Sequence, residues 1–262
     1  MRHTLDDEEE QLNAGIVPTI DIQWQSRQSK VKYVVVCPHT LQVLTLPLQG
    51  QKIGSIDVKY PEFDDSNNND NQDNDQDNDE YDEDEQLYSA MTKSHLQKKY
   101  PQESIPIVLY NNDVLVLTFP NFSNIITFNV ISEKLIEQVD TEYWLCLAPS
   151  NLNNNQTINK LYVDNDINIS LLNQIPNLKP PHIVTGISAA IVSQLNYNNY
   201  KNFAMIVLNS EGHPGFEKSD SDAIVDTAYI LSNLFIKQKE YLTEISKRIR
   251  KFNPYSNSGM YL

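Results

Sequence analysis

The segment TGISAA at residues 185–190 places a serine where a nucleophile could stand. Ser188 follows Gly186 by two residues, between a predicted strand and a predicted helix, which is the setting of a nucleophilic serine on a tight turn. A hydrolase of that kind also needs an acid and then a histidine downstream, but the last histidine, His213, precedes the plausible acids. These acids are Asp220, Asp222 and Asp226. Ala190 also replaces the second glycine of the turn. We therefore interpret the small residues as letting the helix start pack closely on a sheet, with a hydrolase using Ser188 as the alternative.

A second polar group, NSEGHPGFEK at residues 209–218, follows a predicted strand. Ser210, Glu211 and His213 would lie at the carboxyl end of that strand, where α/β folds place ligands. A metal site needs more than one histidine at a defined spacing, and the other four of the five histidines are scattered. We interpret the glycines and the proline as shaping a rigid structural or partner-contact loop. Catalysis by the Glu211/His213 pair is the alternative.

Cofactor and nucleic-acid signals are missing from the sequence. None of the seven glycines falls in the spacing of a dinucleotide or Walker motif, so we expect no cofactor and no metal. The net charge is −15, but residues 62–85 carry thirteen acidic residues without a lysine or arginine, and without them the charge becomes −2. The rest of the chain has no basic stripe for nucleic acid and no polybasic segment for a membrane.

The cysteines and the first residues indicate a reducing compartment. Cys37 and Cys146 both lie in apolar runs and are not in C-x-x-C spacing, so they are expected to be buried thiols. The acidic start MRHTLDDEEEQ has no signal-peptide character. No apolar run approaches the roughly 20 residues of a membrane span. We therefore expect a cytosolic or nuclear protein.

The first half of the chain is predicted to be rich in strands. Residues 31–37, 41–48 and 52–60 are β-branched or alternating runs, which indicate strands. The acidic stretch that follows has too few apolar residues to offset the entropy of ordering, and we treat residues 62–103 as a disordered insertion in a loop. Residues 105–119 form two apolar runs around Asn111–Asp113, a hairpin pattern.

Helices and buried strands are predicted to alternate in the second half. We expect a helix at 124–139, a buried strand at 143–149, a loop at 150–160 and another buried strand at 202–209. Residues 180–195 are predicted to run from an extended segment through a glycine turn into a helix. Residues 219–252 are predicted to be one long helix, opened by capping Ser and Asp residues and stopped by Pro254.

These elements predict an α/β fold class, with a mixed, partly parallel sheet between helical layers. The predicted organisation is one domain made of residues 1–61 and 104–252, interrupted by the insertion 62–103. Residues 253–262 are predicted to be a flexible C-terminal tail, because apolar residues stand only at its tip.

Three stretches together resemble a known family. PPHIVTGISAAIVSQL, NSEGHPGFEKSDSDAIVD and the final SGMYL are similar to fungal members of the proteasome assembly chaperone subunit 1 family. The resemblance covers about residues 180–222 and the last five residues, and the element order over 105–150 is compatible with it. The acidic insertion has no counterpart in that pattern. The most specific element is the SEGxxGFEK loop, whose matching residues are Ser210, Glu211, Gly212, Gly215, Phe216, Glu217 and Lys218.

The resemblance implies a role for the end of the chain. In that family the last three residues, here Met260, Tyr261 and Leu262, have the form hydrophobic–Tyr–X and insert between neighbouring α-subunits of the proteasome core particle. A terminal carboxylate can pair with a lysine at the base of such a pocket, and a tyrosine is a common anchor at interfaces.

The resemblance therefore implies a non-enzymatic chaperone. It would pair with a second proteasome assembly chaperone subunit as a heterodimer and bind proteasome α-subunits, without a cofactor, nucleic acid or membrane. Two alternatives stay open at this point. One is an α/β hydrolase or nucleoside-processing enzyme that uses Ser188 or the Glu211/His213 loop. The other is an adaptor whose acidic tract 62–85 binds a basic protein.

Overall fold

The structure is a computed structural model that describes residues 16–26, 30–61, 91, 94, 96–162, 170–236 and 239–252. The acidic tract 62–85 and the predicted tail 253–262 lie outside the described residues. No described helix is long and apolar enough to cross a membrane.

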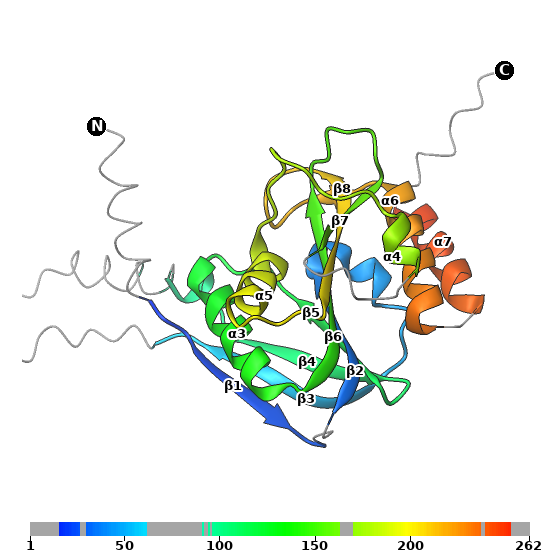
Figure 1. Cartoon of the computed structure of the whole chain (residues 1–262). Coiled ribbons are helices and arrows are strands. Elements are labelled where there is room, and N and C mark those ends of the chain that lie inside the picture. Colours follow the sequence, from blue (N-terminus) through cyan, green and yellow to red (C-terminus); the bar gives the residue numbers. More distant parts are fainter. Residues whose placement is uncertain are drawn as a thin grey trace, which may run out of the picture.

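The described residues form a nine-stranded mixed sheet (Figure 1). Its order is β1-β3-β4-β5-β2-β6-β8-β7, and the short β9 pairs with β8 off this path. Neighbouring strands from β5 through β2 and β6 to β8 are parallel, and the remaining pairs are antiparallel. The strands are β1 (Thr19–Trp24), β2 (Val31–Pro38), β3 (Gln51–Lys59), β4 (Glu103–Tyr110), β5 (Val114–Phe119), β6 (Thr141–Ser150), β7 (Ile158–Tyr162), β8 (Phe203–Glu211) and β9 (Lys218–Ser219).

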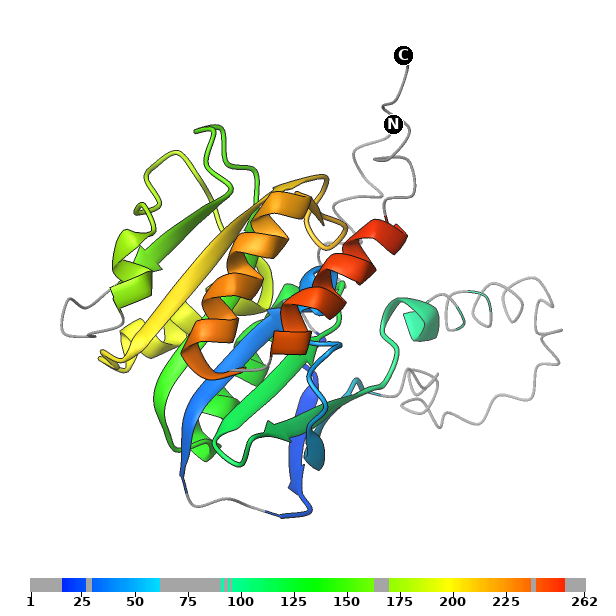
Figure 2. The same ribbon diagram turned by 90° about the vertical axis from the view of Figure 1, so that its right-hand side faces the viewer.

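Helical layers cover both faces of the sheet, as Figures 1 and 2 show. α3 and α5 lie on one face, and η1, α6 and α7 lie on the other. Alternate residues of the central strands divide between the two cores: Val34 and Val36 of β2 face α3 and α5, while Val35 faces the other layer. The helical segments are η1 (His39–Leu44), α3 (Ile125–Gln138), α4 (Ser170–Gln174), α5 (Gly186–Tyr197), α6 (Ser221–Leu231), η3 (Ser232–Ile236) and α7 (Lys239–Phe252).

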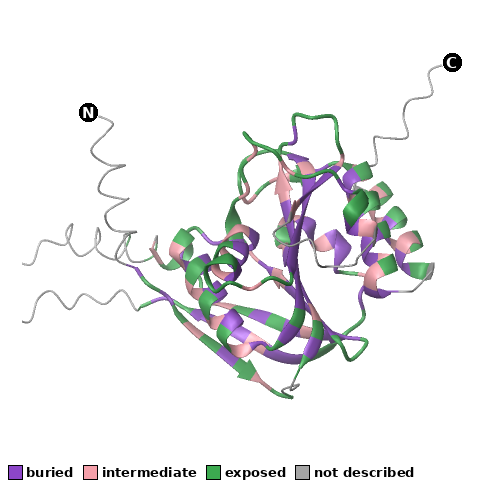
Figure 3. Ribbon diagram, viewed as in Figure 1, coloured by how far each residue is buried: buried purple, intermediate pink, exposed green. Residues whose placement is uncertain are grey.

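This architecture confirms the predicted fold class. Parallel strands covered on both faces must be apolar on both faces, and the burial pattern in Figure 3 follows this rule along the central strands. The predicted hairpin at 105–119 is confirmed as β4 and β5, with positive φ angles at Asn111 and Asn112 in the three-residue turn 111–113 between the paired Tyr110 and Val114. The predicted helix at 124–139 is confirmed as α3, whose N-terminus is capped by Asn124 accepting from the Ile126 N–H at 3.0 Å.

The predicted strand at 41–48 is wrong. Residues His39–Leu44 form the 3-10 helix η1 instead. Leu41 and Leu44 are three residues apart, so one 3-10 turn buries both on the same side. Pro47 also cannot donate a ladder hydrogen bond, which disfavours a central strand there.

The predicted single helix at 219–252 is also wrong. α6 ends at Leu231, a π-helical turn follows as η3, and α7 begins at Lys239. The side chains of Ser232 and Asn233 both donate to the Tyr229 carbonyl, at 2.8 and 2.7 Å. Such bonds compete with the regular helical pattern, and the chain turns there to lay α7 across the sheet.

The structure adds two edge strands and moves one boundary. β1 was not assigned from the sequence, and β7 begins inside the predicted loop 150–160. The chain also re-enters the fold before residue 104: Tyr100 is buried and packs on Tyr60, with ring centroids 5.1 Å apart. The last residues of the predicted insertion therefore belong to the domain.

Candidate partner-binding site

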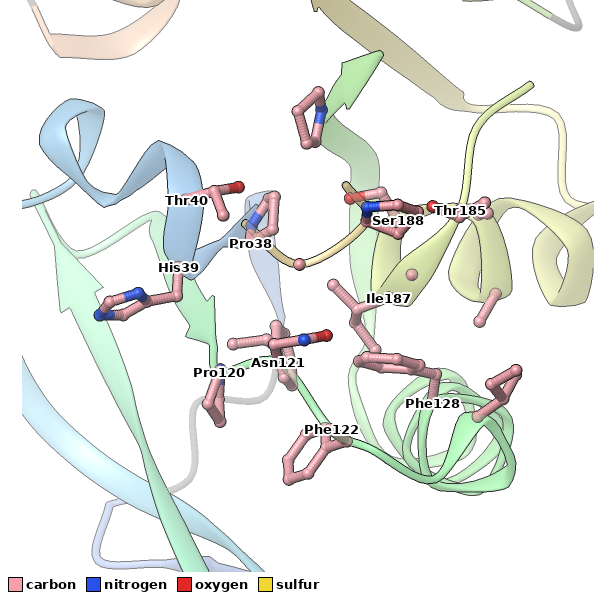
Figure 4. Close-up of a pocket in the computed structure, with 18 of the residues that line it drawn as sticks. Pro38, His39, Thr40, Pro120, Asn121, Phe122, Phe128, Thr185, Ile187 and Ser188 are labelled. Atoms are coloured by element: carbon pink, nitrogen blue, oxygen red, sulfur yellow. The ribbon is translucent and has the colours of Figure 1, made fainter. Parts of the chain in front are cut away.

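A cavity of about 690 Å³ opens where the parallel strands end. It lies beyond the carboxyl ends of β2, β5 and β6 and beside the start of α5. The chain leaves β2 toward η1 on one face and leaves β5 toward α3 on the other, so this is a switch point of the kind where α/β sheets bind ligands. Figure 4 shows side chains from all these elements converging on the opening.

The floor of the cavity is apolar and its rim is polar. Three phenylalanines and an isoleucine form the floor: Phe119, Phe122, Phe128 and Ile187. Amide and hydroxyl side chains come from Asn121, Asn129, Ser123, Ser193, Thr40 and Thr185, and Glu217 adds a carboxylate. No lysine or arginine is among the described residues that line the cavity, so a phosphate group would find no cationic partner there.

Ser188 lies beside this cavity but faces the sheet. Its side chain is only 2% exposed, and its hydroxyl donates to the Leu147 carbonyl of β6 at 2.5 Å. His39 also lines the cavity, but its ring points away from Ser188 (Figure 4). The hydroxyl therefore ties the first turn of α5 to the sheet, as expected for small residues that allow close packing.

Two of the three acids that a hydrolase could use, Asp220 and Asp226, are bonded elsewhere. Asp220 accepts a hydrogen bond from the Asn209 side chain, and Asp226 accepts one from the Thr157 hydroxyl at 2.6 Å. Both bonds join α6 or its N-cap to strands and loops on the sheet. In the part of the chain that the structure describes, no three His, Cys, Asp or Glu residues are placed to hold a metal ion.

Gly186 is the residue that the turn into α5 requires. Its φ is +74°, and no atom lies within 4 Å of the position that a Cβ would take, so the backbone conformation alone selects glycine. The preceding N-cap residue, Thr185, makes no side-chain hydrogen bond to the first turn. The first N–H groups of α5 therefore have no side-chain cap on the cavity side.

The predicted partner loop is a closed hairpin between β8 and β9. Ser210 pairs with Ser219 and Glu211 pairs with Lys218 across the two strands. The buried Ser210 and Ser219 hydroxyls are hydrogen-bonded at 2.6 Å. The Phe216 N–H donates to the His213 carbonyl at 2.9 Å, which closes the tip of the loop. The structure thus brings the loop residues together as one rigid unit.

Two glycines shape the tip of the partner loop. Gly212 and Gly215 have φ angles of +116° and +87°, conformations that favour glycine. A Cβ on Gly215 would overlap the side-chain amide of Asn121, which follows β5. The loop is therefore held against the rim of the cavity.

Phe216 stands out from this rigid loop, with 80% of its side chain exposed. Ile125 at the start of α3 and Ile183 before α5 are each 75% exposed. Ile125 lines the cavity, as do Gly215 and Glu217 on either side of Phe216. Ile125 and, through its neighbours, Phe216 therefore lie beside the cavity. Exposed apolar residues beside a hollow are typical of protein-binding surfaces.

The largest pKa shifts lie in the core and not in this site. Burial raises the pKa of the Cys37 and Cys146 thiols, which are fully buried and unpaired with one another as predicted. Burial also raises the pKa of Tyr241, whose hydroxyl donates to the Leu44 carbonyl at 2.8 Å. The Tyr241 bond joins α7 to η1.

Sequence reasoning missed the part of the site that comes from residues 119–129. Phe119, Asn121, Phe122 and Phe128 carry no catalytic chemistry, so their types gave no signal. The segment PNFSN at 120–124 directly follows a buried strand, and that position could have pointed to the edge of the sheet. The predicted residues Met260, Tyr261 and Leu262 lie outside the described residues.

Comparison with known proteins gives the fold and the family. A Thermoplasma acidophilum protein of unknown function has a TM-score of 0.51 at 11% identity, with 89% of each chain covered. Proteins of unknown function from Corynebacterium glutamicum ATCC 13032 and Mycobacterium tuberculosis have TM-scores of 0.42 and 0.34, at 11% and 10% identity. These alignments cover 92% and 90% of this chain and 99% and 89% of the other two.

No curated protein matches the chain. The first of these structures shows a shared fold alone, because the identity is low. The family model for the POC1 chaperone matches residues 1–262. A match over the whole chain, including the rigid loop and the cavity beside it, is decisive: the protein belongs to the POC1 chaperone family.

Proposed function

We propose that this chaperone assists assembly of the proteasome core particle. In this proposal it pairs with a homologous second chaperone subunit, and the heterodimer binds the outer face of the α-ring of precursors in the cytoplasm or nucleus. It acts by binding energy alone, favouring correct rings and blocking early access of regulatory particles. The observation that carries the proposal is the match to a chaperone family over residues 1–262.

The partner loop supports a role in protein binding. A buried Ser210–Ser219 hydrogen bond and two positive-φ glycines hold the loop in one conformation, so little entropy is lost when a partner covers it. Phe216 at its tip offers a large exposed apolar surface. A hydrolase that uses Ser188 as its nucleophile has no comparable support, because the Ser188 hydroxyl is hydrogen-bonded to the sheet.

Residues 260–262 support the choice of the proteasome. Met260, Tyr261 and Leu262 supply an adaptable apolar side chain, an aromatic anchor and a final apolar residue. Full burial of one such side chain contributes about 1.5–3 kcal/mol, so one tail binds weakly. A second subunit with its own tail would add avidity through effective concentration.

The test compares the affinity for core-particle precursors of four versions of the chain, each paired with the second subunit. We expect wild type to bind most tightly, and deletion of 260–262, Tyr261→Ala and addition of one alanine after Leu262 each to weaken binding. The extension separates carboxylate recognition from simple hydrophobic contact, which would tolerate an extra alanine. Equal affinities for all four would reject the tail as the anchor.

The partner loop needs a separate measurement. Phe216→Ala should weaken pairing or ring binding without a loss of thermal stability, because the side chain is 80% exposed. Tyr197→Ala is the matched control, since Tyr197 is 79% exposed at the far end of α5. An equal effect of both substitutions would mean that the loop has no special part in binding.

A further inference from the structure

The cavity described above has an apolar floor and polar groups around its opening. We propose that residues 253–262 bind back into the cavity of the same chain, so that the apolar tip is held there until the α-ring takes it. This inference rests on the proposed function in one respect: it describes regulation of the same tail. The intramolecular contact itself does not require the proteasome.

The chemistry of the cavity suits an apolar chain segment. Its floor consists of Phe119, Phe122, Phe128 and Ile187, and its polar groups are concentrated at the rim. A volume of about 690 Å³ lies within the range of sites that hold small ligands or a few side chains. The described lining has no lysine or arginine, which disfavours a phosphate ligand.

The reach of the chain allows the contact. α7 ends at Phe252, at the end of the sheet where the parallel strands also end, as Figures 1 and 2 both show. Ten residues follow Phe252 in the sequence, and fully extended they span about 33–36 Å. That is roughly the diameter of a small domain, so any point on this end of the sheet is within reach.

Charge and hydrogen bonding also match. The segment NPYSNSGMYL has no charged side chain, so none of its side chains would repel Glu217, the only carboxylate among the described residues that line the cavity. The Tyr261 hydroxyl can donate a hydrogen bond to the Glu217 side chain. The uncapped N–H groups at the start of α5 can donate hydrogen bonds to backbone carbonyl or carboxylate oxygens of the segment.

Binding of the tail to the cavity of its own chain would compete with its binding to the α-ring. The apparent affinity of a ligand falls in proportion to the fraction of molecules whose binding segment is free. If the tail occupies the cavity about nine-tenths of the time, blocking the cavity should raise affinity for the ring about tenfold. A merely structural role of the cavity predicts the opposite sign, because damage to the fold weakens binding.

The first experiment uses the purified full-length chain without any partner. p-Benzoylphenylalanine in place of Tyr261 should, on irradiation, crosslink within the same chain to residues 119–129 or 185–193. The same crosslinker in place of Ser256, nearer to α7, serves as the control and should give far less of this product. No crosslink, a crosslink to another surface, or one between isotopically heavy and light copies would overturn the proposal.

The second experiment fills the cavity from α5. Ser193→Trp adds a large ring at a lining position, and Asn196→Trp is the control on the same helix at an exposed position outside the lining. Ser193→Trp should abolish the crosslink and raise affinity for the ring several-fold, whereas the control should change neither. The proposal would be overturned if the Ser193→Trp variant kept the crosslink. It would also be overturned if Ser193→Trp weakened binding to the ring and the Asn196→Trp control did not.

The two proposals fail in different ways. If an intramolecular crosslink forms but deletion of 260–262 leaves the affinity for the ring unchanged, the tail is rejected as the proteasome anchor. The crosslink would still support docking of the tail in the cavity. Ring binding that depends on the tail, without any crosslink to the cavity, would reject only the intramolecular contact.

Discussion

Gly215→Ala tests whether the partner loop is rigid for the reasons given. The substitution has two costs. An alanine at φ +87° is in a left-handed conformation, which costs about 1–2 kcal/mol. Its Cβ would also overlap the side-chain amide of Asn121, and turning that exposed side chain away from its rotamer costs about 0.5–1.5 kcal/mol. We therefore expect a loss of about 1.5–3.5 kcal/mol in the free energy of unfolding.

Gly186→Ala is the matched control because it carries the first cost without the second. Its φ is +74°, and no atom lies within 4 Å of the new Cβ, so we expect a loss of about 1–2 kcal/mol. Gly215→Ala in an Asn121→Ala background should fall to the same value, because the overlapping amide has been removed. The coupling between Gly215 and Asn121 is then the difference, about 0.5–1.5 kcal/mol.

Urea unfolding of the four variants and wild type, followed by circular dichroism, measures these differences. A loss of about 1.5–3.5 kcal/mol would lower the melting temperature by about 3–14 °C for a domain of this size. Equal costs for Gly215→Ala with and without Asn121 would refute the inference that the loop is held against the cavity rim. A cost near zero for both glycines would refute the backbone argument as well.

Four further outcomes are expected. Ser188→Ala should cost about 1–2 kcal/mol through the lost bond to Leu147, and a fluorophosphonate probe should not label folded wild type; stoichiometric labelling at Ser188 would revive the hydrolase. Cys37 and Cys146 should resist iodoacetamide until the chain unfolds, because burial raises the pKa of both thiols. For the same reason the free energy of unfolding should fall as pH rises above about 8.5, the ordinary thiol pKa, because only the unfolded thiols ionise there. A free energy of unfolding that stays constant up to pH 10, followed by tryptophan fluorescence, would contradict this. Deleting 64–85 should change the free energy of unfolding by less than about 1 kcal/mol, since loop-closure entropy varies slowly with length, and loss of folding would show that the segment is structural.

The elements with strong local signals could be predicted from the sequence. The hairpin at 105–119 has two asparagines at its turn, which accept the positive φ angles observed there. The helix at 124–139 has a capping Asn124, and the strand at 143–149 is a continuous apolar run between helices. In each case the residues of the element contain most of the information about it.

Elements defined by distant neighbours could not be predicted. β1 and β7 are short edge strands, and each is fixed by pairing with one neighbour, β3 or β8. η1 resembles a strand in composition, but burial of Leu41 and Leu44 under α7 selects the 3-10 form. The break between α6 and α7 depends on how both helices meet the sheet, which no helical periodicity records.

The site shows the same division between local and distant information. The glycine-rich loop from Ser210 to Lys218 was predicted to be a rigid contact loop, and its hairpin geometry agrees with rigidity. Its neighbour Asn121 could not be found, because the contact joins loops nearly a hundred residues apart. Sequence order did argue against a triad at Ser188, and the hydrogen bond to Leu147 gives the physical reason.

The polar and apolar groups at this end of the sheet have separate tasks. Several polar side chains that a catalytic reading would choose are bonded to the scaffold: Ser188 to Leu147, Ser210 to Ser219, Asp220 to Asn209 and Asp226 to Thr157. Large apolar side chains project from the scaffold at the same edge, namely Phe216, Ile125 and Ile183. Hydrogen bonds that fix a loop, combined with exposed apolar side chains, favour binding over group transfer, since binding needs a preorganised surface and a reaction needs an available acid, base or nucleophile. The division of residues at this edge is therefore the one expected of a chaperone that works by contact.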